Sequence, residues 1–300
     1  MILIISKNNE TTTTEVLKWL LSMNKKFIRI DEDEFFEIKM VDNNLLLQSE
    51  RNRFFLNDIT SVWYRRGGIK FKRYQYESEA INIHMQEAQH WLEEYALHIL
   101  ESKRHINKQT KSHVNKLLVL ETAKKVGLDV PEYFLSNNTD NVDLGKTIVK
   151  SITGNVILQN LTKDNDGIMY TSVVDKKSEG DFFISFFQEK IEKDFEVRTF
   201  YLEGKIWSTA IFSQNNQQTQ LDFRKYDIEL PNRNVRYLLP KNIEEMVCKL
   251  MKELDLNCGS IDFIKSKDKF YFLEVNVVGQ FLSLSDICNY SLDEEIANYL

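Results

Sequence analysis

Two apolar segments near the end of the chain carry oxygen-bearing side chains where a buried strand would ordinarily have only hydrocarbon. The first segment contains Asp262, and the second contains Glu274 and Asn276. The polar turn at 265–269 between them predicts a hairpin, and alternation along a strand places Glu274 and Asn276 on one face. Two carboxylates and an amide suit Mg²⁺, which takes its remaining ligands from water and nucleotide phosphates. We interpret the three residues as a candidate metal site, although a solvent-facing hairpin edge would give the same pattern.

Basic side chains that could complete a nucleotide site occur earlier in the chain. Lys150 ends a predicted strand and precedes a short flexible segment that could cover phosphates, and Lys116 follows Asn115 at the start of a predicted helix. Arg198 and Arg224 are candidates for bidentate contact with phosphate or carboxylate. Each of these residues, taken by itself, could equally be a surface cation.

The segment 187–198 passes from an apolar strand through charged residues into a second strand. Backbone groups at such a crossover could recognise adenine, and an acidic side chain could bind the ribose hydroxyls. The candidate contacts are Gln188, Glu189, Ile191, Asp194 and Glu196.

The first thirty residues predict a β-α-β unit. Residues 2–5 form a short apolar run, residues 15–21 have helical spacing, and residues 26–30 return to a strand, as in a parallel sheet. At a rough 150 residues per domain, 300 residues predict about two domains. The polar segment at 106–115 is the first candidate for a boundary between them.

Composition excludes several classes of protein. A net charge of −6 argues against a protein that coats nucleic acid, which needs a basic face. Only 10 glycines and 3 prolines exclude collagen-like and largely disordered chains. Three cysteines without a C-x-x-C pair encode neither a disulfide framework nor a zinc ribbon. No apolar run approaches the roughly 20 residues of a membrane span, so we expect no membrane association and a cytoplasmic location.

Two features of the N-terminal third could bind a partner. A basic cluster without acidic residues follows a predicted strand, and two glycines open the backbone beside it. It could contact an acidic peptide or be a solvated loop. The long amphipathic helix from Glu77 to about Lys103 could pack internally or against a second copy of the chain, which would make a homodimer. The basic cluster that follows the predicted strand comprises Arg65, Arg66, Lys70, Lys72 and Arg73.

The order of these signals along the chain resembles the ATP-grasp superfamily. A closer likeness is to the ATP-grasp peptide maturases of graspetide (microviridin-type) pathways, with the grasp-with-spasm branch nearest. Where many relatives have proline after the metal-binding asparagine, this chain has Val277. The elements that carry the likeness are Val62-Trp63-Tyr64-Arg65-Arg66, Asn115-Lys116, Gly127-Leu128-x-Val130-Pro131, Asp222-Phe223-Arg224 and Phe272-Leu273-Glu274-Val275-Asn276-x-x-Gly279-Gln280-Phe281.

The resemblance implies an α/β protein with the ATP-grasp fold. Its expected parts are an N-terminal pre-ATP-grasp domain at 1–105, a central domain at 106–190 and a C-terminal grasp domain at 191–300. It implies ATP and Mg²⁺ as cofactors, and it leaves the ribose contact open between Asp194 and Glu196. By the same likeness Arg198 and Arg224 hold the γ-phosphate or the acceptor carboxylate. The implied triphosphate contacts are Lys116 and Lys150, and the implied Mg²⁺ ligands are Asp262, Glu274 and Asn276.

The resemblance also implies an activity. Such an enzyme activates Asp or Glu carboxylates of a ribosomal precursor peptide as acyl phosphates and closes ester or amide rings with Thr, Ser or Lys side chains. Its partner is the leader and core of that peptide, and no general base is obvious in the sequence. The candidate leader contacts are Arg65, Arg66, Lys70 and Arg73. Two alternatives are an intermolecular carboxylate-amine ligase of the glutamate-adding or glutathione-synthesising kind, and a nucleotide-binding regulatory module without turnover.

Overall fold

The computed structural model describes residues 1–153, 157–162, 165–214 and 231–300. The chain forms two compact units, one comprising residues 1–112 and 291–300 and the other residues 113–290. Within the described ranges no helix is long and apolar enough to cross a membrane. The subdivision of the chain at 105 and 190 stays a prediction.

The first unit is built on the predicted β-α-β opening, whose strands continue into a parallel sheet of order β2-β1-β6-β8. All four residues of β1 are buried, as its unbroken apolar sequence requires. Leu3 and Ile5 share a core with Ala96 and Leu100 of helix α2. The bounds are β1 Ile2–Ile5, α1 Thr11–Ser22, β2 Phe27–Ile30, β6 Ser61–Tyr64, α2 Glu79–Glu101 and β8 Arg104–Ile106.

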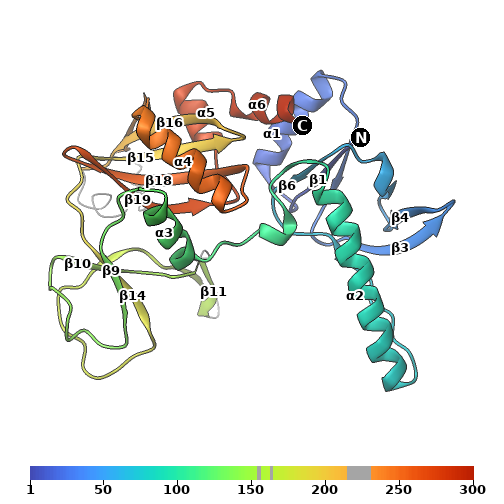
Figure 1. Cartoon of the computed structure of the whole chain (residues 1–300), viewed down its shortest axis with the longest axis horizontal. Helices are drawn as coiled ribbons and strands as arrows, with labels where there is room; N and C mark the ends of the chain where they lie inside the picture. The colour runs from blue at the N-terminus through green and yellow to red at the C-terminus, as the bar shows by residue number, and fades with distance from the viewer. Residues whose placement is uncertain (154–156, 163–164, 215–230) are drawn as a thin grey trace. The chain divides into compact units, whose positions relative to one another are not determined.

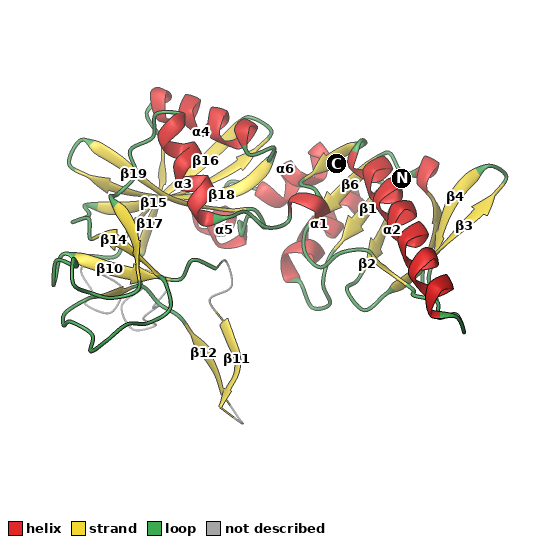
Figure 2. Ribbon diagram, turned by 60° about the horizontal axis from the view of Figure 1, so that its bottom comes forward, coloured by secondary structure: helices red, strands yellow, loops and turns green. Residues whose placement is uncertain are grey.

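A second sheet in this unit has the order β5-β4-β3-β7 and carries the β3–β4 hairpin (Figure 2). Helix α2 extends well past the sheet against which its C-terminal half packs (Figures 1 and 2). The bounds are β3 Phe35–Val41, β4 Asn44–Gln48, β5 Arg53–Phe55, β7 Lys70–Phe71, and the short 3₁₀ helices Leu56–Asp58 and Gln109–Lys111.

The last helix of the chain, α6 (Leu292–Tyr299), packs on α1 of the first unit. Leu292 and Ile296 are at most 1% exposed. The Lys25 ammonium donates to the Ala297 carbonyl over 2.8 Å, and the Ser61 hydroxyl donates to the Leu300 carbonyl over 2.8 Å. The last ten residues therefore fold with the N-terminal unit, although the sequence analysis grouped them with the segment that starts at 191.

The second unit contains two larger sheets and the hairpin β11–β12. The smaller of the two sheets is antiparallel, with the order β13-β10-β14-β9. The bounds are β9 Tyr133–Ser136, β10 Thr147–Lys150, β11 Ile157–Thr162, β12 Asn165–Ile168, β13 Ser172–Val173 and β14 Ser185–Glu189.

The larger sheet of this unit is antiparallel with the order β17-β16-β15-β18-β19. Helices α3 and α4 cover one face of it, and Figure 1 shows α4 running across the strands. Phe263, Phe272 and Val247 of α4 are fully buried in that layer. The opposite face carries the predicted site residues of these strands, which are Glu196, Arg198, Asp262, Glu274 and Asn276. The bounds are α3 Lys116–Lys125, β15 Phe195–Leu202, β16 Lys205–Phe212, β17 Arg233–Tyr237, α4 Lys241–Glu253, β18 Cys258–Ser266, β19 Lys269–Asn276 and α5 Leu282–Cys288.

Candidate functional site

The strands β18 and β19 form the predicted hairpin, and their register brings the oxygen-bearing residues together. Asp262 pairs with Glu274, and Ser260 pairs with Asn276. The Asn276 amide nitrogen lies 3.4 Å from Asp262 Oδ2 and 3.5 Å from Glu274 Oε1. The three side chains therefore converge on one point of the sheet.

A β-bulge decides which face these residues occupy. Phe270 and Phe272 are buried in the core beneath α3 and α4, and strict alternation from them would point Glu274 and Asn276 into the same core. The register shifts between Asp262 and its neighbour Phe263, leaving one extra residue in β19. This extra residue moves Glu274 and Asn276 to the opposite face, where Asp262 already lies. The bulge thus removes the conflict between an apolar core and a polar site.

Two cations lie against the carboxylates in this structure. Arg198 is opposite Asp262 across β15 and β18, and its Nε lies 3.3 Å from Asp262 Oδ1. The Lys116 ammonium lies 2.9 Å from Glu274 Oε2. Arginine and lysine balance the two negative charges, which offsets the cost of partly burying them. The described residues contain no group of three or more His, Cys, Asp or Glu that could bind a metal, so the asparagine is needed to complete an oxygen donor set.

Lys116 owes its position to a helix cap. Asn115 caps α3 by accepting hydrogen bonds from the backbone N–H groups of Leu117 and Leu118 over 3.0 and 3.4 Å. Lys116 is therefore the first helical residue, and its ammonium also donates to the Ser151 carbonyl over 3.2 Å. Ser151 directly follows Lys150, so the end of β10 is tied to the same cluster.

The crossover between β14 and β15 is held by backbone hydrogen bonds. Glu189 N–H donates to the Glu132 carbonyl over 2.8 Å, just beyond the buried Gln188, and Lys190 N–H donates to the Lys146 carbonyl over 2.8 Å. Ile191 is half-buried. The segment that we predict to contact adenine thus has a defined path.

The two candidate ribose contacts differ in their surroundings. Asp194 is exposed and accepts the backbone N–H of Lys267 over 2.8 Å, which holds the turn of the β18–β19 hairpin. Glu196 is buried on the same face as Arg198, beside Lys193 and Ser213. Burial raises the pKa of Glu196, although Lys193 acts in the opposite direction.

Comparison with known proteins shows the fold to which this geometry belongs. Residues 1–113 match the family model of the MvdD pre-ATP grasp domain. A Chryseobacterium gregarium RiPP-associated ATP-grasp ligase, solved in complex with ADP and a leader and core peptide, is 23% identical with a TM-score of 0.79, over 100% of this chain and 96% of that chain. Macrocyclase MdnC from Microcystis aeruginosa, bound with precursor peptide MdnA, is 26% identical with a TM-score of 0.75, over 100% and 99% of the two chains. This chain has the ATP-grasp fold.

Macrocyclase MdnB from the same organism has the ATP-grasp fold as well, with 21% identity, a TM-score of 0.71 and coverage of 100% and 98%. No curated protein matches the chain. The α/β class and the ATP-grasp fold predicted from the sequence are confirmed. The roles of the individual site residues stay predictions, and Arg224 lies outside the described residues.

Within the ATP-grasp fold, sequence reasoning missed Lys193 and Ser213. Lys193 lies in the charged crossover, where a lysine is ordinarily exposed, but its side chain is 5% exposed. The spacing of three residues between Lys193 and Glu196 was the available signal. Ser213 had none, because its contact with Glu196 depends on the pairing of β15 with β16.

The basic cluster of the pre-ATP-grasp domain does not form one exposed surface. Arg65 is buried and its guanidinium lies 3.1 Å from the Glu10 carboxylate, while Arg66 is half-buried near the same carboxylate. Arg73 donates to both carboxylate oxygens of Glu93 over 2.5 and 2.7 Å. Lys70 is exposed, 5.7 Å from the centre of the Phe35 ring. Lys70 and Arg73 are thus exposed, Arg66 is partly exposed and Arg65 is buried.

Glu10 connects the ends of two neighbouring parallel strands. It caps α1, accepting the Thr13 N–H over 2.8 Å, and pairs with Arg65 at the end of β6. Burial pushes the pKa of Glu10 upward, but Arg65 and the hydrogen bonds from Thr13 outweigh it and hold the pKa below its usual 4.5. This carboxylate therefore stabilises the domain above pH 4.5, and the contribution is lost as pH falls through the lowered pKa.

We predict that Glu10→Gln destabilises the protein by about 3 kcal/mol at pH 7, because it leaves the buried Arg65 cation without its carboxylate partner. Urea unfolding followed by circular dichroism measures the change, and the difference from wild type should shrink towards pH 3. Glu15→Gln is the matched control on the same helix, because Glu15 pairs with Lys18 at the surface. This substitution should lower the free energy of unfolding by less than about 1 kcal/mol. Equal effects of the two substitutions at pH 7 would contradict the prediction.

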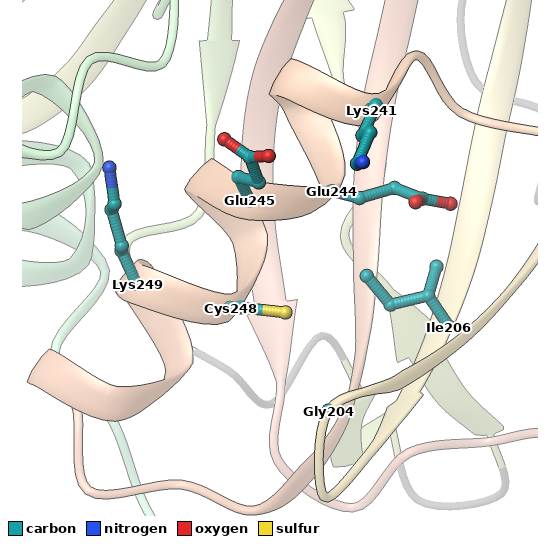
Figure 3. Close-up of a pocket in the computed structure, with 7 residues that line it drawn as sticks. All are labelled: Gly204, Ile206, Lys241, Glu244, Glu245, Cys248 and Lys249. Carbon is teal, nitrogen blue, oxygen red and sulfur yellow. The ribbon is translucent and has the colours of Figure 1, made fainter.

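A surface pocket of 590 Å³ lies on the second unit, between α4 and the β15–β16 hairpin (Figure 3). Burial raises the pKa of the Cys248 thiol, and Glu244 and Glu245 raise it further, so the thiol is poorly reactive. None of the predicted site residues lines this pocket. Its lining residues are Gly204, Ile206, Lys241, Glu244, Glu245, Cys248 and Lys249.

Proposed function

We propose that this chain is an ADP-forming ATP-grasp ligase that closes ester or amide rings in a ribosomally made precursor peptide. The observation that carries the proposal is the convergence of Arg198, Asp262, Glu274 and Asn276 on one face of the β15–β18–β19 sheet, with Lys116 of α3 paired to Glu274. The Chryseobacterium ligase, which shares the fold over the whole chain, was solved with ADP and with a leader and core peptide. Both lines of support point to nucleotide chemistry on a peptide.

The reaction joins two parts of one peptide. An Asp or Glu carboxylate of the peptide attacks the γ-phosphorus of ATP, which releases ADP and leaves an acyl phosphate. A Thr, Ser or Lys side chain of the same peptide then attacks the acyl carbon, the C–O bond to phosphate breaks, and phosphate leaves. The peptide loses one water in total. Such transfers depend on positioning and on charge neutralisation more than on a covalent nucleophile of the enzyme.

The residues of the cluster divide this work. Asp262, Glu274 and Asn276 would hold Mg²⁺, which when bound neutralises phosphate charge and screens it from the attacking carboxylate. Lys116 and Lys150 bind the triphosphate, and Arg198 together with Arg224 orients the γ-phosphate and the acceptor carboxylate. Arg198 is suited to this because it already pairs with a carboxylate in this structure.

Coexpression with a candidate precursor tests the proposal. The precursor should be sought as a small open reading frame that neighbours the gene for this chain and is rich in Thr or Ser and in Asp or Glu. Mass spectrometry should show loss of one water for each ring, dependent on ATP. Addition of an amino acid to the peptide would instead indicate an intermolecular carboxylate-amine ligase. Nucleotide binding without any change in peptide mass would indicate a regulatory module.

The leader and a second copy of the chain are the further partners that we propose. Lys70 is exposed and Arg66 is partly exposed on the pre-ATP-grasp domain, so both cations can pair with an acidic leader segment. Replacing both with Ala should weaken precursor binding and leave ATP affinity unchanged. A cytoplasmic location suits the need for ATP and the three free cysteines.

Helix α2 supports the proposal of a homodimer. Ile83, Trp91 and Tyr95 are each more than 50% exposed on its surface, and Leu92 is nearly so. Apolar side chains gathered on one helix are typical of an interface. Sedimentation should detect a dimer that Trp91→Lys disrupts, and a monomeric wild-type protein at all concentrations would contradict it.

A further inference from the structure

Lys193 and Glu196 form a buried ion pair that the proposed mechanism does not use. The Lys193 ammonium lies 2.8 Å from Glu196 Oε1, and the two side chains are 5% and 9% exposed. Ser213 donates its hydroxyl to the other carboxylate oxygen over 3.1 Å. Both carboxylate oxygens therefore have partners inside the protein.

Burying such a pair is a poor way to gain stability. Removing two charges from water is unfavourable, and an apolar pair of the same volume is often as stable. What a buried pair does provide is a fixed geometry, because each charge must stay beside the other. The pair is therefore best understood from the elements that it connects.

The pair connects the β14–β15 crossover and strand β15, which carry candidate site residues, with the end of β16. Lys193 lies in the crossover that runs from Glu189 towards β15, and Glu196 lies on β15 two residues before Arg198 and on the same face. Ser213 directly follows β16. Glu196 thus holds the crossover and the end of β16 against the strand that carries Arg198.

We propose that Lys193 and Glu196 are positioning residues that fix the β14–β15 crossover in the path required for nucleotide binding. This inference rests on the proposed function, because it takes the crossover as the adenine side of the ATP site. It differs from a direct contact of Glu196 with the ribose. In our proposal the Glu196 carboxylate acts through Lys193 and Ser213, and Asp194, which faces solvent, is not part of the clamp.

The test compares ATP with 2′,3′-dideoxy-ATP, which lacks both ribose hydroxyls. Calorimetry measures the Kd of each Mg-nucleotide for wild type, Lys193→Met, Glu196→Gln and the double variant. Each single variant should bind both nucleotides more weakly by the same factor, about 10- to 100-fold, the range for losing a residue that orients a site. The double variant should be no weaker than the worse single variant, because it leaves no unpaired buried charge.

Lys252→Met removes an exposed lysine on α4 and should change neither Kd. Single variants that bind like wild type would overturn the proposal. So would a Glu196→Gln defect that disappears with dideoxy-ATP, because Glu196 would then be a ribose ligand, or losses that add in the double variant.

A second readout needs no nucleotide. Hydrogen exchange at residues 190–194 should be faster in Lys193→Met than in wild type and in Lys252→Met, and unchanged exchange would overturn the clamp. If Lys193→Met fails to fold, the double variant, which restores charge balance, serves for both measurements against wild type. Failure of the wild-type protein to bind Mg·ATP would overturn the proposed function and leave the exchange result to decide the clamp.

Discussion

Asp262→Asn is expected to slow ATP-dependent ring closure by about 100- to 1,000-fold, the usual effect of removing one group that stabilises developing charge. Asp262 is the carboxylate that both Arg198 and Asn276 approach, so its charge sets the centre of the donor set. The neutral amide would weaken Mg²⁺ binding and remove the negative charge that Arg198 contacts in this structure. The rate of water loss from the precursor and the rate of ADP release measure the effect together.

Asp268→Asn is the matched control for this prediction. Asp268 lies in the exposed turn of the same hairpin and should behave like wild type. Circular dichroism should show that Asp262→Asn remains folded, since this side chain lies outside the apolar core. Turnover of the Asp262→Asn enzyme at the wild-type rate would contradict the assignment of Asp262 as a metal ligand. It would also contradict the proposed arrangement of the cluster.

Ile296→Ala is expected to destabilise the N-terminal unit by about 2–5 kcal/mol, because it removes a fully buried side chain from the contact of α6 with α1. Hydrogen exchange resolved along the chain is the right measurement, since two units need not unfold in one transition. Exchange should rise in α1, where the Trp19 indole donates to Asp293 of α6 over 2.8 Å.

The neighbouring residue Asn298 provides the control for Ile296→Ala. Its side chain is exposed on the same helix, so Asn298→Ala should change stability by less than about 0.5 kcal/mol. Unchanged exchange in α1 of the Ile296→Ala protein would mean that α6 is not needed to stabilise the N-terminal unit. The result also bears on truncated proteins, because deleting the last ten residues removes the whole contact.

Local sequence patterns were sufficient wherever the neighbours that matter are close along the chain. The apolar run of β1, the Asn115 cap and the turn between β18 and β19 each depend on a few adjacent residues, and each is present in the structure. The oxygen donors Asp262, Glu274 and Asn276 could be named for the same reason. They stand out as polar residues in strands that are otherwise apolar.

The exposure of charged side chains could not be predicted in this way. The run of cations after Trp63 reads as a surface, but Arg65 turns inward to a carboxylate 55 residues earlier in the chain. Lys193 likewise reads as solvated and is buried. In both cases the partner is set by which strands and loops meet, and a lysine or arginine carries no local mark of that partner.

The sequence by itself determined the kinds of strands, the chemistry of the candidate donor set and the order of the candidate nucleotide-binding elements, because these depend on residue type and short spacing. Only the tertiary structure decided which face the donors share. Every second residue from Phe270 to Asn276 would lie on one face of a regular strand. Alternation alone would therefore bury Glu274 and Asn276 with the phenylalanines. One extra residue in β19 puts the two phenylalanines and the two polar residues on opposite faces. The position of this bulge depends on two tertiary requirements, which are the packing of the aromatic rings under α3 and α4 and the pairing of β19 with β18.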